Sequence, residues 1–280
     1  MGNLALEKVK KVSTFRKIAI GTWKTVGDPS VYGTLEVGMD RALDYIARYR
    51  AATGRKVTIS HLMAKAAAAA LEEVPDANAV LRFNRIYRRK RIGVFFQVAM
   101  VDEETDEIDL SGAVIYDVEK KNLGEVTDEF AEKVSHVRKR TDTELEKTRG
   151  IFKWIPYMLL NRFLAFIGFL SFTLNLRLPG LPVDPFGSIM VTNVGSLGID
   201  QAYVPLVPYS RVPMILAVGA PKRVPVVEGD EVVIRSRMKI CASFDHRFID
   251  GVHVSRMGKV ISRWLDDPDQ YFGPVEAKDA

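Results

Sequence analysis

The sequence predicts an α/β fold in one domain, and three observations support this. Helical and strand-like patterns are mixed along the chain, which is typical of α/β or α+β proteins. The 280 residues are 47% hydrophobic and 27% charged, an ordinary composition for a globular protein with a sizeable core. No internal repeat or low-complexity linker divides the chain.

The expected elements follow from hydrophobic periodicity. Strands are expected at residues 32–40, 79–82, 92–101, 113–116, 188–193, 214–219 and 232–244. Helices are expected at residues 41–53, 58–73, 122–149 and 251–265. Strands 79–82 and 92–101 are expected to pair with each other around a basic cluster.

The two N-terminal helices carry clear local signals. Asp40 is expected to cap the first helix and Gly54 to end it. The second helix has an alanine-rich face that should pack against something flat, such as a sheet. His61 lies in its first turn, where we expect a capping or core histidine rather than a catalytic one.

The basic cluster at residues 82–91 stands out from a mild net charge of +5 and a pI near 9.2. It could form a solvated hairpin edge, where positive charge discourages strand addition, or contact the phosphates of a ligand. No zinc-finger spacing or RNA-binding signature accompanies it, so no nucleic-acid partner is expected.

The single cysteine, Cys241, lies in an apolar run and is expected to be a buried, unreactive thiol. One cysteine cannot form an internal disulfide, which fits a reducing, cytoplasmic setting. The N-terminus has no signal-peptide core. No bound metal is expected.

The segment at about 151–180 is unusually apolar. Fourteen uncharged residues separate Arg162 from Arg177, and as a helix they would span about 21 Å, short of the ~30 Å core of a bilayer. We therefore do not expect a membrane-spanning helix. Three interpretations stay open: a helix buried in an oligomer, an apolar substrate channel, or a helix lying on a membrane surface.

The strongest chemical signal is Asp245-His-Arg-Phe-Ile-Asp-Gly251. The preceding strand would deliver His246 at the edge of a sheet, with Asp250 four residues on and Gly251 permitting a tight turn. Histidine exchanges protons near neutral pH and can remove a proton from a thiol or alcohol. A core histidine paired with a carboxylate would have the same local pattern, so these residues alone leave both interpretations open.

This segment resembles the Asp-His-Arg-x-x-Asp-Gly signature of the dihydrolipoamide acyltransferases, the core subunits of 2-oxoacid dehydrogenase complexes. Further similarities occur in family order, at Phe15-Arg-Lys-Ile-Ala, Val74-Pro-Asp-Ala-Asn, Val191-Thr-Asn-Val-Gly and Pro213-Met-Ile-Leu-Ala-Val-Gly. The resemblance implies a two-layer sandwich similar to chloramphenicol acetyltransferase, with a mixed β-sheet and flanking helices.

The resemblance also implies roles for individual residues. His246 would be the general base that deprotonates the thiol of coenzyme A (CoA) or dihydrolipoamide, and Thr192 would donate to the oxyanion. Asp250 would brace the active-site loop by charge pairing, while Asn193 and Gly195 would shape the turn after their strand. In this family the active site lies between subunits, so a homotrimer or a higher oligomer is implied.

The chain departs from the family's usual subunit in several ways. The lipoyl-bearing Asp-Lys-Ala motif is absent, so a lipoyl or other carrier protein would act in trans. The segment 154–185 is more apolar than expected, and the C-terminus lacks the leucine-rich end that joins family trimers into cages. We therefore expect an N-terminal extension at 1–12, a catalytic domain at 13–272 and a tail at 273–280.

The resulting hypothesis is a CoA-dependent acyltransferase that acts on a thiol or another small acceptor. Two alternatives remain: a non-catalytic oligomeric scaffold of the same fold, and an acyltransferase that contacts a membrane and acts on a lipid-like acceptor.

Overall fold

A seven-stranded mixed sheet organises the molecule, and the prediction of a mixed α/β fold is confirmed. The computed structural model describes residues 2–9, 28–101, 108–138 and 156–275. Phe15-Arg-Lys-Ile-Ala lies outside the described residues. The main sheet has the order β2-β10-β8-β7-β5-β6, and β9 pairs with the outer part of β10. Its strands are β2 (Ser30–Gly38), β5 (Gly93–Val101), β6 (Ile108–Tyr116), β7 (Ile189–Asn193), β8 (Met214–Val218), β9 (Lys222–Glu228) and β10 (Glu231–Asp245).

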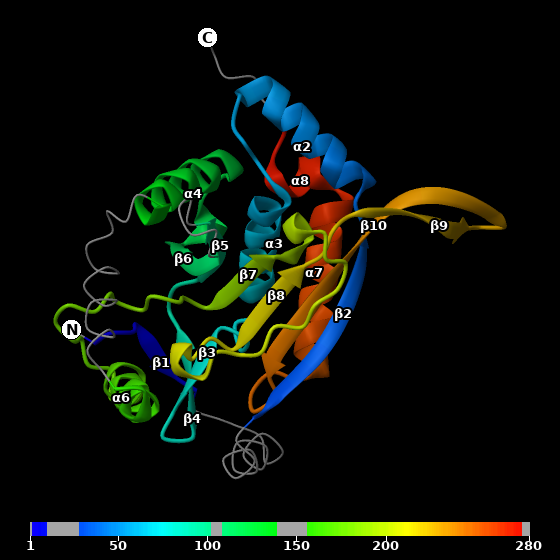
Figure 1. Cartoon of the computed structure of the whole chain (residues 1–280). Helices are drawn as coiled ribbons and strands as arrows, with labels where there is room; N and C mark the ends of the chain where they lie inside the picture. Colours follow the sequence, from blue (N-terminus) through cyan, green and yellow to red (C-terminus); the bar gives the residue numbers. More distant parts are fainter. Residues whose placement is uncertain (1, 10–27, 102–107, 139–155, 276–280) are drawn as a thin grey trace.

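Helices cover one face of this sheet (Figure 1). They are α2 (Asp40–Thr53), α3 (Ile59–Glu73), α4 (Leu123–Arg138), α7 (Gly251–Asp266) and the short α8 (Pro268–Phe272). The alanine face of α3 is completely buried and packs against α7, β5 and β7, as its composition predicts. On the other face, Met190 and Ile215 pack under residues of the segment 204–212.

The predicted pairing of strand 79–82 with strand 92–101 is wrong. Strand β3 (Ala79–Arg82) pairs with β4 (Arg85–Arg89) in a separate three-stranded sheet with β1 (Leu6–Lys8), while β5 belongs to the main sheet. The two-residue turn Phe83–Asn84 has positive φ at both positions, the conformation of a tight hairpin turn. Phenylalanine gives no turn signal, which is why the sequence did not predict this hairpin.

Most of the basic cluster lies on this hairpin, and several of its arginines are paired. Arg88 bonds to Asp76 at 2.7 Å, Arg89 to Asp184 at 2.6 Å and Arg91 to Asp117 at 2.6 Å. The Arg89–Asp184 pair is largely buried and ties β4 to the loop before β7.

Two predicted helix boundaries need correction. Met39 is the N-cap of α2, and Asp40 is the first helical residue, whose Oδ1 accepts from the Ser236 backbone N–H at 3.1 Å. Gly54 ends the helix in the left-handed conformation, as predicted. The helix expected at 122–149 begins at Leu123, and residues 139–155 lie outside the described part of the chain.

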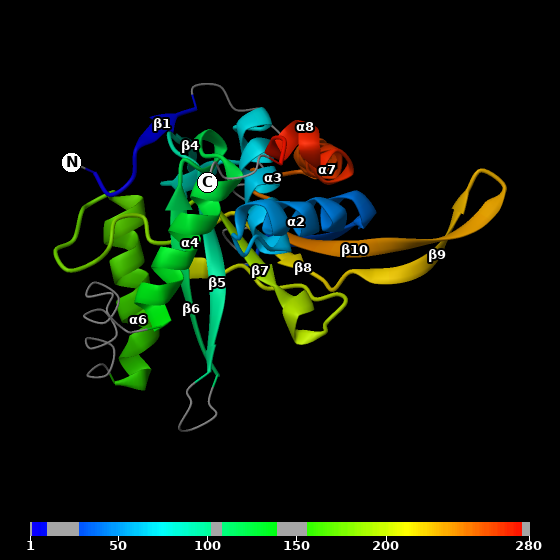
Figure 2. The ribbon, with the colours of Figure 1, turned by 90° about the horizontal axis from the view of Figure 1, so that it is seen from above.

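The apolar segment forms helix α6 (Tyr157–Gly168), followed by a single π-helical turn at Phe169–Thr173. Helix α6 lies beside β1 and the β3–β4 hairpin, apart from the helices that cover the main sheet (Figures 1 and 2). No helix within the described ranges is long and apolar enough to cross a membrane.

His61 has the structural role that its position predicts. Its Nδ1 accepts from the Thr58 backbone N–H at 3.0 Å in a capping box, and its ring packs edge-on against Phe130. The side chain is 2% exposed. Burial, reinforced by the positive charge of Arg50, lowers the pKa of His61 to about 4.

The free energy of unfolding should therefore fall as the pH drops. In the unfolded chain His61 takes up a proton near pH 6.5, whereas in the folded chain it does so only near pH 4. The free energy of unfolding should therefore fall by about 2 kcal/mol between pH 6.5 and pH 5. Urea unfolding of the wild type and His61→Gln at both values measures this, because glutamine keeps a capping acceptor without titrating. An equal pH dependence in both proteins would contradict the assignment.

Candidate active site

His246 is the first residue after β10 and is fixed from two sides. Its backbone N–H donates to the Pro29 carbonyl at 3.0 Å, and its Nδ1 lies 2.8 Å from the Ile249 carbonyl oxygen. Because a carbonyl oxygen only accepts, Nδ1 must carry a hydrogen. In the neutral ring the lone pair is then on Nε2, so this is the nitrogen that can take up a proton.

Asp245 and Arg247 pair with each other across His246. The Arg247 guanidinium donates to the Asp245 carboxylate through Nε at 2.9 Å and Nη2 at 2.5 Å, and its backbone N–H donates to the same carboxylate at 3.0 Å. Asp245 is buried, and its backbone carbonyl accepts from the N–H of Ile249 at 3.0 Å. These bonds close a compact loop that holds the imidazole in place.

Asp250 caps helix α7 on the far side of this loop. Its Oδ1 accepts from the backbone N–H groups of Val252 and His253 at 3.0 and 3.2 Å. The His253 Nδ1 lies 2.7 Å from the same oxygen. The contacts described here hold the backbone between His246 and α7, and none of them passes a proton to the His246 ring.

Thr192 is on β7, and Asn193 ends that strand. The Asn193 Oδ1 accepts from the Ser196 backbone N–H at 3.0 Å, and its Nδ2 donates to the Ser60 Oγ at 3.2 Å. This side chain therefore starts the turn after β7 and ties it to α3. Within the described residues, no hydrogen bond is formed by the Thr192 hydroxyl, so it can serve as a donor.

The strand register places Thr192 and His246 far apart within one chain. Thr192 is level with Ala217 of β8, which is level with Cys241 of β10, two strands away. His246 lies five residues beyond Cys241, which is about 16 Å along the strand, and two interstrand spacings add about 10 Å sideways. One chain cannot bring both side chains to the same reacting atom.

Comparison with known proteins decides the family. The family model of the 2-oxoacid dehydrogenases acyltransferase (catalytic domain) matches residues 6–153 and 186–273, which is most of the chain. The chain belongs to this acyltransferase family. Residues 154–185, which include α6 and the π-helical turn, are left outside the match.

Curated relatives of this chain are distant in sequence. The dihydrolipoyllysine-residue acetyltransferase of the acetoin cleaving system of Bacillus subtilis is 23% identical over 215 residues, covering 77% of this chain and 43% of the relative. The corresponding component of the pyruvate dehydrogenase complex of Rickettsia prowazekii is 23% identical, covering 86% of this chain and 49% of the relative. The chain thus spans about half the length of these relatives.

Solved structures support the acyltransferase fold. The Azotobacter vinelandii dihydrolipoamide acetyltransferase, in a study of the roles of a serine, a histidine and an asparagine in its mechanism, has a TM-score of 0.65 at 20% identity, covering 94% of each chain. The cubic core of a pyruvate dehydrogenase multienzyme complex gives the same values. Chloramphenicol acetyltransferase has a TM-score of 0.51 at 15% identity, covering 93% of this chain and all of that one. The predicted chloramphenicol acetyltransferase-like fold is confirmed.

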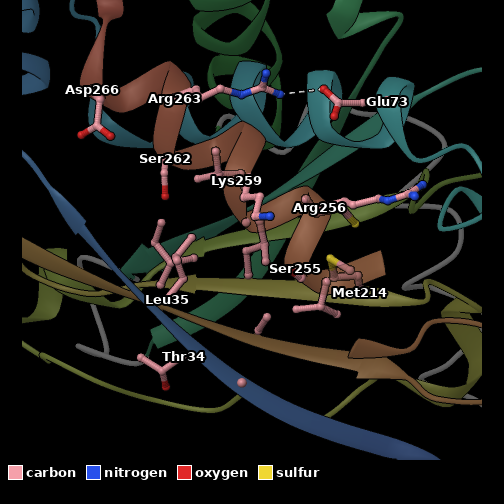
Figure 3. Close-up of a pocket in the computed structure, with 18 residues that line it drawn as sticks. Thr34, Leu35, Glu73, Met214, Ser255, Arg256, Lys259, Ser262, Arg263 and Asp266 are labelled. Atoms are coloured by element: carbon pink, nitrogen blue, oxygen red, sulfur yellow. Dashed lines mark hydrogen bonds and ion pairs between the residues drawn. The ribbon is translucent and has the colours of Figure 1, made fainter. Parts of the chain in front are cut away.

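A cavity of about 760 Å³ lies between α7 and the sheet (Figure 3). Apolar side chains form most of its wall, among them Leu35 of β2 and Met214 of β8. Met214 pairs with Phe244, whose ring centroid is 6.4 Å from that of His246, so Phe244 separates this end of the cavity from the histidine. Lys259 of α7 points into the cavity, and Arg263, which pairs with Glu73 at 2.8 Å, lines it as well.

Arg211 lies near the Asp245–Arg247 pair, although no sequence pattern indicated it as a site residue. It adopts a left-handed backbone conformation, and its charge acts on Arg247 and Asp245. Burial, followed by repulsion from Arg247, lowers its pKa, and its Nε has no hydrogen-bond partner among the described residues. Because it lies 34 positions before Asp245 in sequence, only the fold brings it here.

The two predicted turn glycines behave differently. A Cβ on Gly195 would lie 2.5 Å from the backbone of Gly219, so this turn requires glycine for close approach. Gly251 begins α7, its φ is outside the left-handed region, and no atom of the described residues lies within 4 Å of a Cβ built on it. Within the described part of the chain, neither crowding nor backbone conformation explains Gly251.

Gly195→Ala should therefore destabilise the protein while Gly251→Ala should not. Overpacking against the Gly219 backbone should cost about 1–3 kcal/mol, whereas alanine at the start of α7 meets open space. Thermal unfolding of both variants measures the contrast. Equal melting temperatures would show that the turn after β7 can shift without cost.

Proposed function

We propose that this acyltransferase moves an acyl group between the thioester of CoA and an acceptor thiol. The His246 Nε2 removes the proton from the attacking thiol, and the thiolate adds to the thioester carbonyl. The Thr192 hydroxyl of a neighbouring copy donates to the oxyanion that forms. When the tetrahedral intermediate collapses, the carbon–sulfur bond of the original thioester breaks, and the leaving thiolate takes the proton from His246.

The observation that carries this proposal is the hydrogen bond between the His246 Nδ1 and the Ile249 carbonyl. It selects the tautomer with its lone pair on Nε2, as a base requires, and it holds the ring in one orientation. The Asp245–Arg247 pair fixes the backbone on both sides of the histidine.

Asp250 acts in this proposal as a brace rather than as a proton carrier. Its carboxylate caps α7 and thereby fixes the segment that carries the Ile249 carbonyl. In the Azotobacter enzyme, the histidine and asparagine studied for their catalytic roles are also four positions apart. An asparagine could cap a helix in the same way, since its side-chain oxygen accepts the same backbone bonds.

The site requires at least two chains, and a homotrimer is the assembly that we propose. The register separates Thr192 from His246 within one chain, as described above. In addition, the β9–β10 hairpin projects from the body of the molecule (Figures 1 and 2). Val227 and Val232 are opposite each other on this hairpin and are 73% and 71% exposed. An isolated two-stranded ribbon is marginally stable, so this apolar pair favours contact with another copy.

The cavity between α7 and the sheet is our candidate for the CoA thioester. Its volume is within the range of ligand pockets, its apolar wall suits an extended pantetheine arm, and Lys259 offers a cation for a phosphate. The acceptor that we propose is a dihydrolipoyl group on a separate carrier protein, because the curated relatives are dihydrolipoyllysine-residue acetyltransferases.

Replacing His246 or Thr192 should abolish most transfer. His246→Ala should lower kcat by about 10²–10⁴-fold and Thr192→Ala by about 10²–10³-fold, while Thr192→Ser keeps the donor and most of the rate. Transfer from acetyl-CoA to dihydrolipoamide is followed by chromatography of the CoA that is released, because one thioester replaces another and their total number does not change. Unchanged CoA release in His246→Ala would contradict the proposal and favour a non-catalytic scaffold of the same fold.

Co-expression of the two inactive variants tests whether the site is shared between chains. In randomly mixed trimers, about one quarter of the interfaces combine an intact His246 with an intact Thr192 from the next chain, so about a quarter of the wild-type activity should return. Mixing the two variants as preformed oligomers is the control and should restore none. If co-expression gives only the sum of the single variants, the two residues act within one chain.

Lys259→Gln should raise KM for acetyl-CoA with little change in kcat, because the lysine contacts substrate away from the reacting atoms. Arg48→Gln on α2 is the matched control, since this exposed arginine pairs with Asp44 and Asp269 and does not line the cavity. Steady-state kinetics of both variants separates them. Equal KM values in Lys259→Gln and the wild type would remove the cavity as the CoA site.

A further inference from the structure

We propose that α6, the π-helical turn and the tip of the β3–β4 hairpin form a docking surface for an anionic lipid bilayer. The apolar residues of this surface, here named the apolar ridge, are Phe83, Leu159, Phe166, Phe169, Leu174 and Leu176. All six are exposed, Phe83 by 62% and Phe166 by 57%. The proposal is independent of the acyl-transfer mechanism.

The exposed face of α6 carries large apolar side chains of the kind that a surface helix normally buries. Leu159, Arg162, Phe166 and Phe169 are exposed at a spacing of three or four residues, so they share one side. A surface helix normally presents charged and polar side chains there. Three large apolar groups around one arginine indicate that this side meets something other than water.

The ridge is fixed to the rest of the fold. Phe172 is buried against Leu4 and Val80, and the Arg82 Nε donates to the Thr173 carbonyl at 2.9 Å. The Asn3 Nδ2 donates to the Ser171 carbonyl at 3.1 Å. The exposed rings are therefore presented by a packed structure and not by an unsupported loop.

The hairpin tip joins the ridge directly. The rings of Phe83 and Phe169 meet edge to face, with centroids 6.4 Å apart. Phe83 has a φ of +47°, a conformation that bulky residues rarely adopt. A bulky side chain held in a strained conformation and pointed outward is more typical of a binding surface than of a structural turn.

The charges around the apolar ridge favour an anionic partner. No aspartate or glutamate occurs between Glu146 and Asp184, or between Asp76 and Asp102, the two segments that supply the ridge. Exposed Arg85, Arg162 and Arg177 lie within them. Aromatic and aliphatic side chains edged by arginines match the acyl boundary and the phosphates of an anionic membrane. A site for a protein partner of mixed charge would normally include some acidic side chains, and these two segments have none.

The ridge lies mostly where the sequence departs from the family. Residues 154–185 carry five of the six ridge residues and form the internal segment left outside the family match. The ridge is thus a feature of this chain's own sequence rather than of the family pattern. The ridge contributes no residue to the wall of the cavity beside α7, which argues against a substrate channel there. It is exposed in the single chain, which fits a membrane surface and a contact between copies alike, and its charges favour the membrane.

Vesicle flotation of the full chain tests the proposal. The protein should float with vesicles of equal parts phosphatidylcholine and phosphatidylglycerol and remain unbound with phosphatidylcholine alone. Arg162→Gln with Arg177→Gln should weaken binding about 25-fold, from about fivefold for each cation. Phe83→Ser with Phe166→Ser should weaken it at least about tenfold. Lys56→Gln, which removes an exposed cation outside the ridge, should leave binding unchanged.

Two results would overturn the lipid assignment. The first is no flotation with anionic vesicles at low salt, or equal flotation with both kinds of vesicle. The second is that Phe83→Ser with Phe166→Ser changes the oligomer mass in light scattering without any lipid binding in the wild type, which would make the ridge a contact between copies. The ridge variants should keep wild-type transfer from acetyl-CoA to soluble dihydrolipoamide, so failure of this proposal is distinguishable from failure of the proposed function.

Discussion

The register of β7, β8 and β10 is the constraint on which this account depends. Hydrogen-bonded strands cannot slide by one residue without turning buried side chains outward, so the positions of Thr192 and His246 along the sheet are fixed by the core. Their separation follows from that register. Because His246 and Thr192 lie far apart in the sheet of one chain, the base and the oxyanion donor that we propose can meet only across an interface between chains.

The loop after β10 holds the imidazole of His246, the base that we propose, in one orientation. The Asp245–Arg247 pair, the Ile249 carbonyl and the Asp250 cap each fix one part of the same short segment. Together they choose the imidazole tautomer and its direction before substrate binds. Preorganisation of this kind places the catalytic group without reorganisation during the reaction. Arg211 adds positive charge beside this segment from a distant part of the sequence.

Local signals in the sequence predicted the parts that depend on local physics. Gly54 ends α2, the alanines of α3 are buried, and His61 caps its helix, because each follows from propensity or periodicity. The β3–β4 hairpin was missed since its turn begins with Phe83, a bulky residue that rarely adopts positive φ. The resemblance named His246, Asp250 and Thr192, but neither it nor periodicity indicated Arg211 or the pairing of Asp245 with Arg247. Arg211 reaches this loop only through tertiary packing, and the Asp245–Arg247 pair depends on the conformation of the loop after β10.

Most of the apolar ridge lies in the segment outside the family match, so the proposed membrane surface and the loop at His246 belong to separate parts of the chain. A structure of the assembled protein with acetyl-CoA bound would show whether the proposed site is shared between chains. We expect the thioester sulfur within hydrogen-bond reach of the His246 Nε2, and the thioester oxygen about 3 Å from the Thr192 hydroxyl of a different chain. A thioester bound away from His246, or one contacted by Thr192 and His246 of the same chain, would contradict this proposal.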